Sequence, residues 1–263
     1  KGSLSAGDRA ALDEENAPGI DAAPGVGAYN NFWMEQGYVF EQTSLVVDPK
    51  DGRLPSVTPQ AQQRQEDLLS SRRSPSYPTT YEEPSLMERC ITRGLPGVML
   101  PGNYNHNYNI LQTPSFVAIL AEMIHDTRII PIDGRRHINS SIHQWMGDSR
   151  GHWEGNTLII ESTNFRYVGN MRAPGSGGGN AVQNEGRKMI ETFTIEDEDT
   201  LRYTLTVDDS ETYEAPWTVA FPYEFDNNYK QYEYACHEGN YAMDNRLSGA
   251  RVQELGIAET GAR

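Results

Sequence analysis

The sequence has few of the features that identify a functional class at once. It contains only two cysteines, Cys90 and Cys236, which form neither a Cys-x-x-Cys redox motif nor a zinc-binding cluster. No run of about 18 apolar residues occurs, so no segment is predicted to span a membrane. A G-x-S-x-G motif is also absent, so a covalent hydrolase would need a nucleophile motif of an unfamiliar kind.

Basic side chains are outnumbered by acidic ones. The chain has 22 Lys and Arg against 37 Asp and Glu, which gives a formal net charge of -15 at pH 7. A surface of this sign repels the phosphate backbone of nucleic acids and gains nothing at an anionic membrane. We therefore expect neither binding to nucleic acid nor insertion into a membrane. A small neutral or cationic molecule is the expected partner.

The two cysteines allow either a disulfide or two free thiols in the core. A bridge that closes so long a loop restrains the unfolded chain strongly in the chain-entropy model. The chain also begins at Lys1 rather than at a methionine, as it would after loss of an export signal or a propeptide, or after trimming. Both observations favour a disulfide and a periplasmic or secreted location.

Composition predicts one main domain with an N-terminal arm. Residues 1–37 combine a polar helix pattern with a loop rich in Gly and Pro, which buries little surface. Residues 38–263 are expected to form a single β-rich domain. Within it we expect a helical insertion at about 58–93 and a C-terminal helix at about 240–255.

Two capping signals fall within the expected helical insertion. Thr58 and Pro59 suit the N-cap and the first position of a helix. Ser85 and Glu88 match a capping box, which predicts a second, short helix.

The rest of the chain alternates between strand-like segments and turn signals. The predicted strands are NILQT, SFVAILAEMIHDTRIIPI, HWEG, TLIIESTNF, KMIETFTIE, TLRYTLTVD, YEAPWTVAFPY and KQYEYACHE. Their tight connections favour antiparallel hairpins, and the lack of long helices between them argues against a parallel α/β sheet. We expect a mainly β fold with a few short peripheral helices. An antiparallel up-and-down, lipocalin-like barrel would leave no exposed edges, and a two-sheet β-sandwich is the alternative.

Histidine is the strongest chemical signal. Five of the six histidines fall between positions 106 and 152, and the sixth, His237, lies beside Glu238. Because the unperturbed pKa of histidine lies nearest neutrality, this clustering suits proton transfer or metal ligation.

His125 is the preferred base. If SFVAILAEMIHDTRIIPI is one strand, His125 shares an otherwise apolar face with Val117 and Ile129. It is then either a core imidazole bonded to a backbone carbonyl, or a base that Asp126 and Arg128 tune. A break within the run would exchange the two faces.

Glu191 is the second candidate for acid–base chemistry. It shares a face of its predicted strand with Met189 and Phe193. It is therefore either an inward carboxylate with a raised pKa or the partner of a cationic residue across the sheet. His237 ends the last predicted strand and completes the catalytic candidates.

The remaining candidates would bind substrate or metal. Aromatic and cationic side chains expected to line a cavity are Tyr104, Arg128, Trp145 and Trp217. No cofactor or metal is expected. An alternative metal site would use three histidines from separate strands, His125, His137 and His143, although their spacing matches no strong zinc motif.

Three long segments carry a family resemblance: MIHDTRIIPIDGRRH, QWMGDSRGHWEGNTLIIESTNF and YEYACHEGNY. Together with TSLVVDPKDGRLPSVTPQAQ and ERCI, they make residues 38 to 252 resemble a large group of uncharacterised exported bacterial proteins. The resemblance implies export and places both cysteines in the family pattern, which strengthens the expectation of a disulfide. It implies no activity.

The sequence thus predicts a cofactor-independent acid–base enzyme: a lyase or isomerase by preference, or a hydrolase, acting on a small organic molecule in a β-barrel cavity. His125 would be the base, and Asp126 or Glu191 would orient it. Arg128, Tyr104 or His237 would bind an oxygen on which negative charge develops. The alternatives are a lipocalin-like small-ligand binding protein and a metal-dependent enzyme that uses three histidines.

Overall fold

The computed structural model describes residues 41–71, 78, 80–102, 104–166, 171–172, 180–181 and 185–255. The predicted arm, residues 1–37, lies outside these ranges. The strands are β1 (Val46–Asp48), β2 (Tyr108–Gln112), β3 (Phe116–Ala121), β4 (Thr127–Pro131), β5 (Asp148–Glu154), β6 (Thr157–Thr163), β7 (Met171–Arg172), β8 (Asn180–Ala181), β9 (Lys188–Ile195), β10 (Thr200–Asp208) and β11 (Trp217–Glu224). The helices are α2 (Pro59–Ser71), the short 3-10 helix η2 (Met123–His125) and α3 (Ala242–Glu254).

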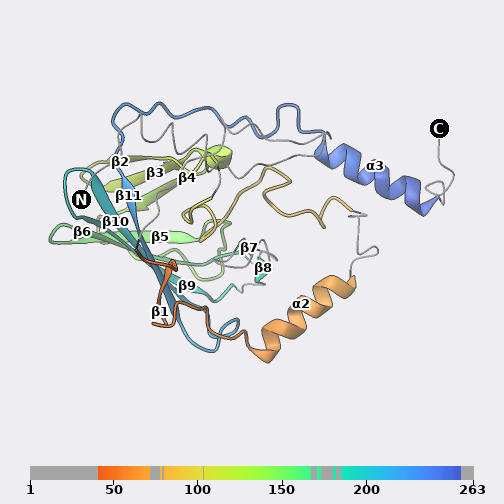
Figure 1. Cartoon of the computed structure of the whole chain (residues 1–263), viewed down its shortest axis with the longest axis horizontal. Helices are drawn as coiled ribbons and strands as arrows, with labels where there is room; N and C mark the ends of the chain where they lie inside the picture. Colours follow the sequence, from red (N-terminus) through yellow and green to blue (C-terminus); the bar gives the residue numbers. More distant parts are fainter. Residues whose placement is uncertain are drawn as a thin grey trace.

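The strands form two main antiparallel sheets. A six-stranded sheet has the order β1-β11-β10-β9-β6-β5, and a three-stranded sheet has the order β2-β3-β4. Strands β7 and β8 pair separately. Figure 1 shows the three-stranded sheet lying over the larger one, with α2 and α3 at the periphery. The mainly β, antiparallel prediction is confirmed.

The core lies between the two sheets. Strand β10 shows how alternation builds it, because Tyr203, Leu205 and Val207 are fully buried while the residues between them are half-buried. Val117 and Ile119 of β3 belong to the same buried cluster. Aromatic rings of β9, β10 and β11 fill the interior where the barrel prediction placed a cavity.

The two sheets do not close into a barrel within the described residues. The end strands of the large sheet, β1 and β5, do not pair with each other. Instead β5 packs against β4 of the small sheet. Gly151 makes this approach possible, because a Cβ there would lie 3.0 Å from Ile132 and 3.1 Å from Ile130. The sandwich alternative therefore fits the arrangement.

The predicted long strand over SFVAILAEMIHDTRIIPI is a hairpin. Strand β3 ends at Ala121, and the chain turns through Ile124 (φ 60°) and His125 (φ 48°) before β4 begins. The turn exchanges the faces, so that Arg128 is buried and Ile129 is exposed. The prediction that His125 and Ile129 share an inward face was therefore wrong, and His125 is exposed at the turn.

The helical predictions hold in part. Thr58 caps α2, since its Oγ1 accepts from the backbone N–H of Ala61 at 3.1 Å. Ser85 and Glu88 exchange both bonds of a capping box, at 2.8 and 3.2 Å, but the residues after them form turns rather than a helix. No helix within the described ranges is long and apolar enough to cross a membrane.

The segment after β11 is irregular where KQYEYACHE was predicted to form a strand. It pairs with neither sheet and leads into α3, which matches the predicted C-terminal helix. Cys90 and Cys236 form a disulfide with a Cα–Cα distance of 5.6 Å. The bridge fixes this segment to the turn that follows the capping box.

Candidate functional site

Glu191 and Arg128, two of the predicted site residues, meet in the core. Arg128 Nη1 donates to Glu191 Oε1 at 2.9 Å, and Nη2 pairs with Oε2. Tyr203 OH also donates to Oε1 at 2.9 Å. Glu191 has no exposed surface and Arg128 only 5%. Of the two interpretations of Glu191, the structure shows the partner of a cation across the sheets, out of reach of a substrate.

The ion pair belongs to a buried polar network that joins the sheets. Arg128 Nη2 also lies 3.3 Å from Ser149 Oγ and 3.5 Å from Ser162 Oγ. Burial by itself lowers the pKa of Arg128, but the Glu191 carboxylate outweighs burial and raises it. Burial, and then the same carboxylate, raise the pKa of Tyr203. Arg128 is therefore a structural cation and not available to a substrate oxygen.

His125 and Asp126 have separate partners. His125 Nδ1 lies 3.0 Å from the carbonyl oxygen of Tyr234. Asp126 Oδ2 accepts from Thr92 Oγ1 at 2.7 Å. Burial raises the pKa of Asp126, and hydrogen bonds from Thr92 and Arg93 offset part of this rise. Asp126 anchors the residue 92–93 segment, and its interaction with His125 among the described residues is electrostatic, a minor contribution that lowers the pKa of Asp126.

The other predicted site residues are dispersed. His237 is exposed in the turn beyond Cys236, and Tyr104 is half-buried. Trp217 is fully buried, with its ring edge-on to Tyr213. The half-buried Trp145 stacks under the guanidinium of Arg166 at 4.7 Å.

The three histidines of the metal alternative also have different partners. His125 meets a backbone carbonyl, His137 meets Asp148, and His143 Nδ1 lies 3.6 Å from Glu185. Across the described ranges, no group of three or more His, Cys, Asp or Glu side chains has the arrangement of a metal site.

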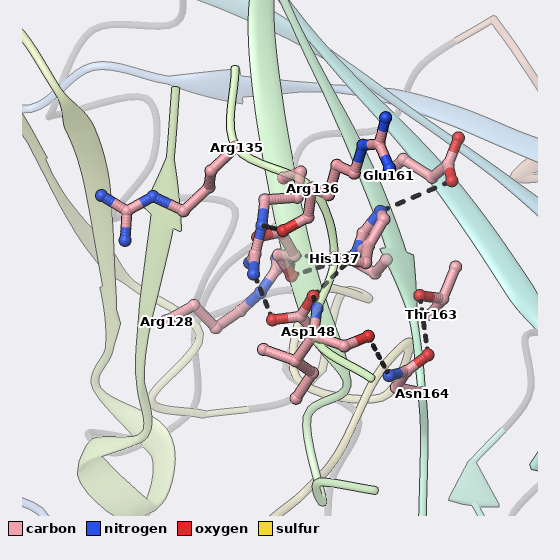
Figure 2. Close-up of polar contacts among 12 residues, drawn as sticks. Arg128, Arg135, Arg136, His137, Asp148, Glu161, Thr163 and Asn164 are labelled. Carbon is pink, nitrogen blue, oxygen red and sulfur yellow. Dashed lines mark hydrogen bonds and ion pairs between the residues drawn. The ribbon is translucent and has the colours of Figure 1, made fainter. Parts of the chain in front are cut away.

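A different polar cluster forms where the loop between β4 and β5 folds back onto β5 (Figure 2). His137 Nδ1 lies 2.7 Å from Asp148 Oδ2, and the backbone N–H of Ile138 donates to the same oxygen at 3.1 Å. Arg150 Nη1 donates to Asp148 Oδ1 at 2.7 Å. A carboxylate only accepts, so the Nδ1 of neutral His137 carries the proton and Nε2 has the lone pair.

The other nitrogen of His137 points toward Glu161. Nε2 lies 3.5 Å from Glu161 Oε1, along the dashed line in Figure 2, and this contact becomes an ion pair only when His137 is protonated. The side chain of Asp148 is 7% exposed, that of His137 26% and that of Glu161 52%. Exposure thus increases outward from a buried carboxylate, through the imidazole, to a carboxylate at the surface.

Neighbouring backbone contacts fix the loop on both sides of His137. Arg150 Nε donates to the carbonyl oxygen of Arg136 at 3.0 Å. Asn164 Nδ2 donates to the carbonyl oxygens of Ile138 and Asn139 at 3.2 and 3.0 Å. The backbone on both sides of His137 is therefore held in place, in addition to the contact of its ring with Asp148, as a positioned base requires.

Sequence reasoning included His137 only as a possible metal ligand and missed Asp148, Arg150 and Glu161. The signal was present in GDSRG, in which successive residues face opposite sides of the strand and alternate residues share a side. Ser149 joins the core network, whereas Asp148 and Arg150 face the loop that carries His137.

One surface hollow of about 440 Å³ lies elsewhere, between residues 80–81 and α3. Its lining residues are Thr80, Tyr81, Asp244, Leu247, Ser248 and Arg251. None of them is a predicted site residue or a member of the His137 cluster, so the hollow and the acid–base groups are separate features.

Comparison of the chain with known protein families, with curated proteins and with solved structures finds no match. The His137 cluster must therefore be interpreted from its own geometry.

Proposed function

We propose that this chain is an acid–base enzyme in which His137 is the general base and Asp148 its positioning residue. The observation that carries the proposal is the 2.7 Å contact between His137 Nδ1 and the buried Asp148 carboxylate, with Nε2 on the more exposed side. A carboxylate in this position holds the tautomer and stabilises the imidazolium that forms when Nε2 takes a proton.

The chemistry needs only groups that the chain supplies. Nε2 removes a proton from a substrate carbon, and the electron pair either expels a leaving group or shifts to a neighbouring carbonyl oxygen. The imidazolium then returns the proton at another position or to water. Arg136 is exposed and forms no ion pair within the described part of the chain, so its guanidinium is available to an oxygen on which charge develops. Elimination or isomerisation of a small molecule without a cofactor fits these parts.

An exported location is part of the proposal. Disulfides persist in oxidising compartments, and the Cys90–Cys236 bridge supports a periplasmic or secreted protein. The resemblance to exported bacterial proteins points the same way.

The competing interpretation is that His137 only anchors its loop. A probe that reports a positioned base without knowledge of the substrate separates the two. In 5-nitrobenzisoxazole, a base removes the proton from C3 as the N–O bond breaks, and a coloured cyanonitrophenolate forms. Because a positioned base contributes on the order of 10²-fold or more, we expect H137Q to remove most of the protein-dependent rate.

The control is H152Q. His152 is exposed on β5 and lies 3.3 Å from Glu154, so it resembles His137 in type but lacks a buried carboxylate. H152Q should keep the wild-type rate, and D148N should lower it while the circular dichroism spectrum stays unchanged. Equal rates for wild type, H137Q and H152Q would reject His137 as a base and leave it a structural anchor.

A further inference from the structure

Strand β2 is an edge strand with unusual exposure. It pairs only with β3 in the described structure, and four of its residues, Asn109 to Gln112, are exposed. Leu111 is 57% exposed and Ile110 39% exposed. In Figure 1, β2 lies at the outer margin of the small sheet.

The ladder between β2 and β3 shows which backbone groups face outward. Glu122 N–H donates to Asn107 C=O at 2.9 Å, and Thr113 N–H donates to Phe116 C=O at 2.9 Å. In an antiparallel pair the bonding residues alternate, so Asn109 and Leu111 also bond inward to β3. The N–H and C=O groups of Ile110 therefore point away from the sheet, as do those of Gln112. No partner for these groups occurs among the described residues.

The two edges of the six-stranded sheet, β1 and β5, are protected. Strand β1 has three residues and ends at Asp48–Pro49, and β5 carries charged side chains and packs against the β4 region. These are the usual devices that prevent edge-to-edge pairing. Strand β2 has no charged residue, proline or bulge, and its register with β3 is regular throughout.

Charge indicates which partner fits this edge. The chain has a formal net charge of -15, so two copies repel each other over most of their surfaces. Residues 101–121 contain no Asp, Glu, Lys or Arg. Strand β2 lies within this uncharged stretch, where two identical surfaces approach with the least repulsion.

We propose that β2 pairs antiparallel with β2 of a second copy of this chain, about a two-fold axis at Leu111. Ile110 then exchanges hydrogen bonds with Gln112 of the second copy, and Gln112 with Ile110 of the second copy. The two Leu111 side chains meet in the intervening pair, where cross-strand side chains are closest. An antiparallel pair about such an axis is self-complementary, and it joins the two small sheets into one.

Sedimentation equilibrium over a wide range of protein concentrations tests the pairing. An interface this small predicts a weak dimer, with a Kd on the order of 10 µM. L111K places two like charges across the axis, and I110P removes an outward N–H while leaving the bonds to β3 intact. Each variant is expected to weaken dimerisation by at least about tenfold.

The matched control is I129K. Ile129 lies on the same outer face as Leu111, is also 57% exposed and is on β4, away from the proposed axis. I129K should dimerise like the wild type. A wild-type protein that stays monomeric at millimolar concentration would overturn the proposal, as would a folded L111K or I110P that dimerises as tightly as wild type. Capture of an extended peptide by a monomeric wild type would assign the edge to another partner and also reject self-pairing.

Discussion

Glu191 shows how one side chain gains its role from the opposite sheet. Its carboxylate is fully buried and is neutralised by Arg128, itself nearly buried. Removing one member of a buried pair leaves the other charge without compensation, which typically costs about 3–5 kcal/mol. We therefore expect E191Q to lower the free energy of unfolding in urea by that amount. The double variant R128M/E191L, which removes both charges, should recover part of the loss.

The exposed pair between Arg202 and Glu196 is the control. Its N–O distance is 2.9 Å, but the two side chains are 35% and 40% exposed, and surface pairs of this kind contribute about 0–1 kcal/mol. R202A should therefore change the unfolding free energy little. Equal losses in R202A and E191Q would show that the core network is no stronger than a surface contact.

For single residues, the sequence predicted which side of a strand a side chain faces better than it predicted the partner of that side chain. Alternation on KMIETFTIE placed Glu191 inward correctly. The partner could not be identified, because Arg128 faces the core only as a result of the break between β3 and β4. The pairing of His137 with Asp148 was equally hidden, since a loop conformation and not a periodic pattern brings the two side chains together.

Among the elements, the start of β5 depends on Gly147. Its φ is +71°, and an added Cβ would lie 2.6 Å from the Phe165 ring and 2.7 Å from the Thr163 carbonyl oxygen. A side chain in this backbone region costs about 1–2 kcal/mol, and the overlap with buried neighbours adds to it. G147A should therefore lower the free energy of unfolding by more than about 2 kcal/mol, measured by urea denaturation. Because Asp148 follows directly, the probe reaction should slow as well.

Gly155, just after the other end of β5, is the control that distinguishes the cost of a positive φ from the cost of steric overlap. Its φ is +60°, but nothing lies within 4 Å of an added Cβ. G155A should show the backbone cost alone, about 1–2 kcal/mol. If G147A and G155A destabilise equally, the close packing of Gly147 on Phe165 contributes nothing.

Elements with their own periodicity were predicted well, and elements that depend on distant contacts were not. Strands β6, β9 and β10 lie within the predicted segments, and β11 extends one residue beyond its segment, because alternation and turn residues are local signals. The segment KQYEYACHE has a strand-like composition but pairs with neither sheet as a strand. Hydrogen bonds to the end of β3 and to the residue that follows it hold the segment instead: Gln231 Nε2 to the carbonyl oxygen of Leu120 at 3.2 Å, and the backbone N–H of Tyr232 to Glu122 Oε2 at 3.1 Å.

For the whole molecule, the class of fold was predictable but the closure of the sheet was not. A barrel and a sandwich use similar strands and hairpins, and they differ in whether the end strands pair. Here the loop between β4 and β5 carries the chain from one sheet to the other, and Gly151 lets the sheets meet by packing. The loop that connects the two sheets is also the one that carries His137, so neither the course of this loop nor the position of His137 could be read from strand periodicity.

The disulfide is the strongest link between the body and the C-terminal segment. Only Ala250 of α3 is buried. Polar contacts also join the C-terminal segment to Glu88: Arg246 forms an ion pair with its carboxylate, and Asn240 Nδ2 donates to its carbonyl oxygen at 3.4 Å. The bridge spans 146 positions, and loss of a bridge over so long a loop is expected to cost about 2–5 kcal/mol.

The double variant C90A/C236A should therefore unfold at lower urea concentration than the wild type, and reductant should move the wild type toward the variant without changing the variant itself. Because few apolar contacts hold the segment after β11, limited proteolysis of the variant should begin between Phe225 and Tyr241, before the sheets are cut. Cleavage that begins within β9 or β10 would mean that the disulfide stabilises the sheet core. An unchanged urea midpoint would mean that the polar contacts with Glu88 hold the C-terminal segment without the disulfide.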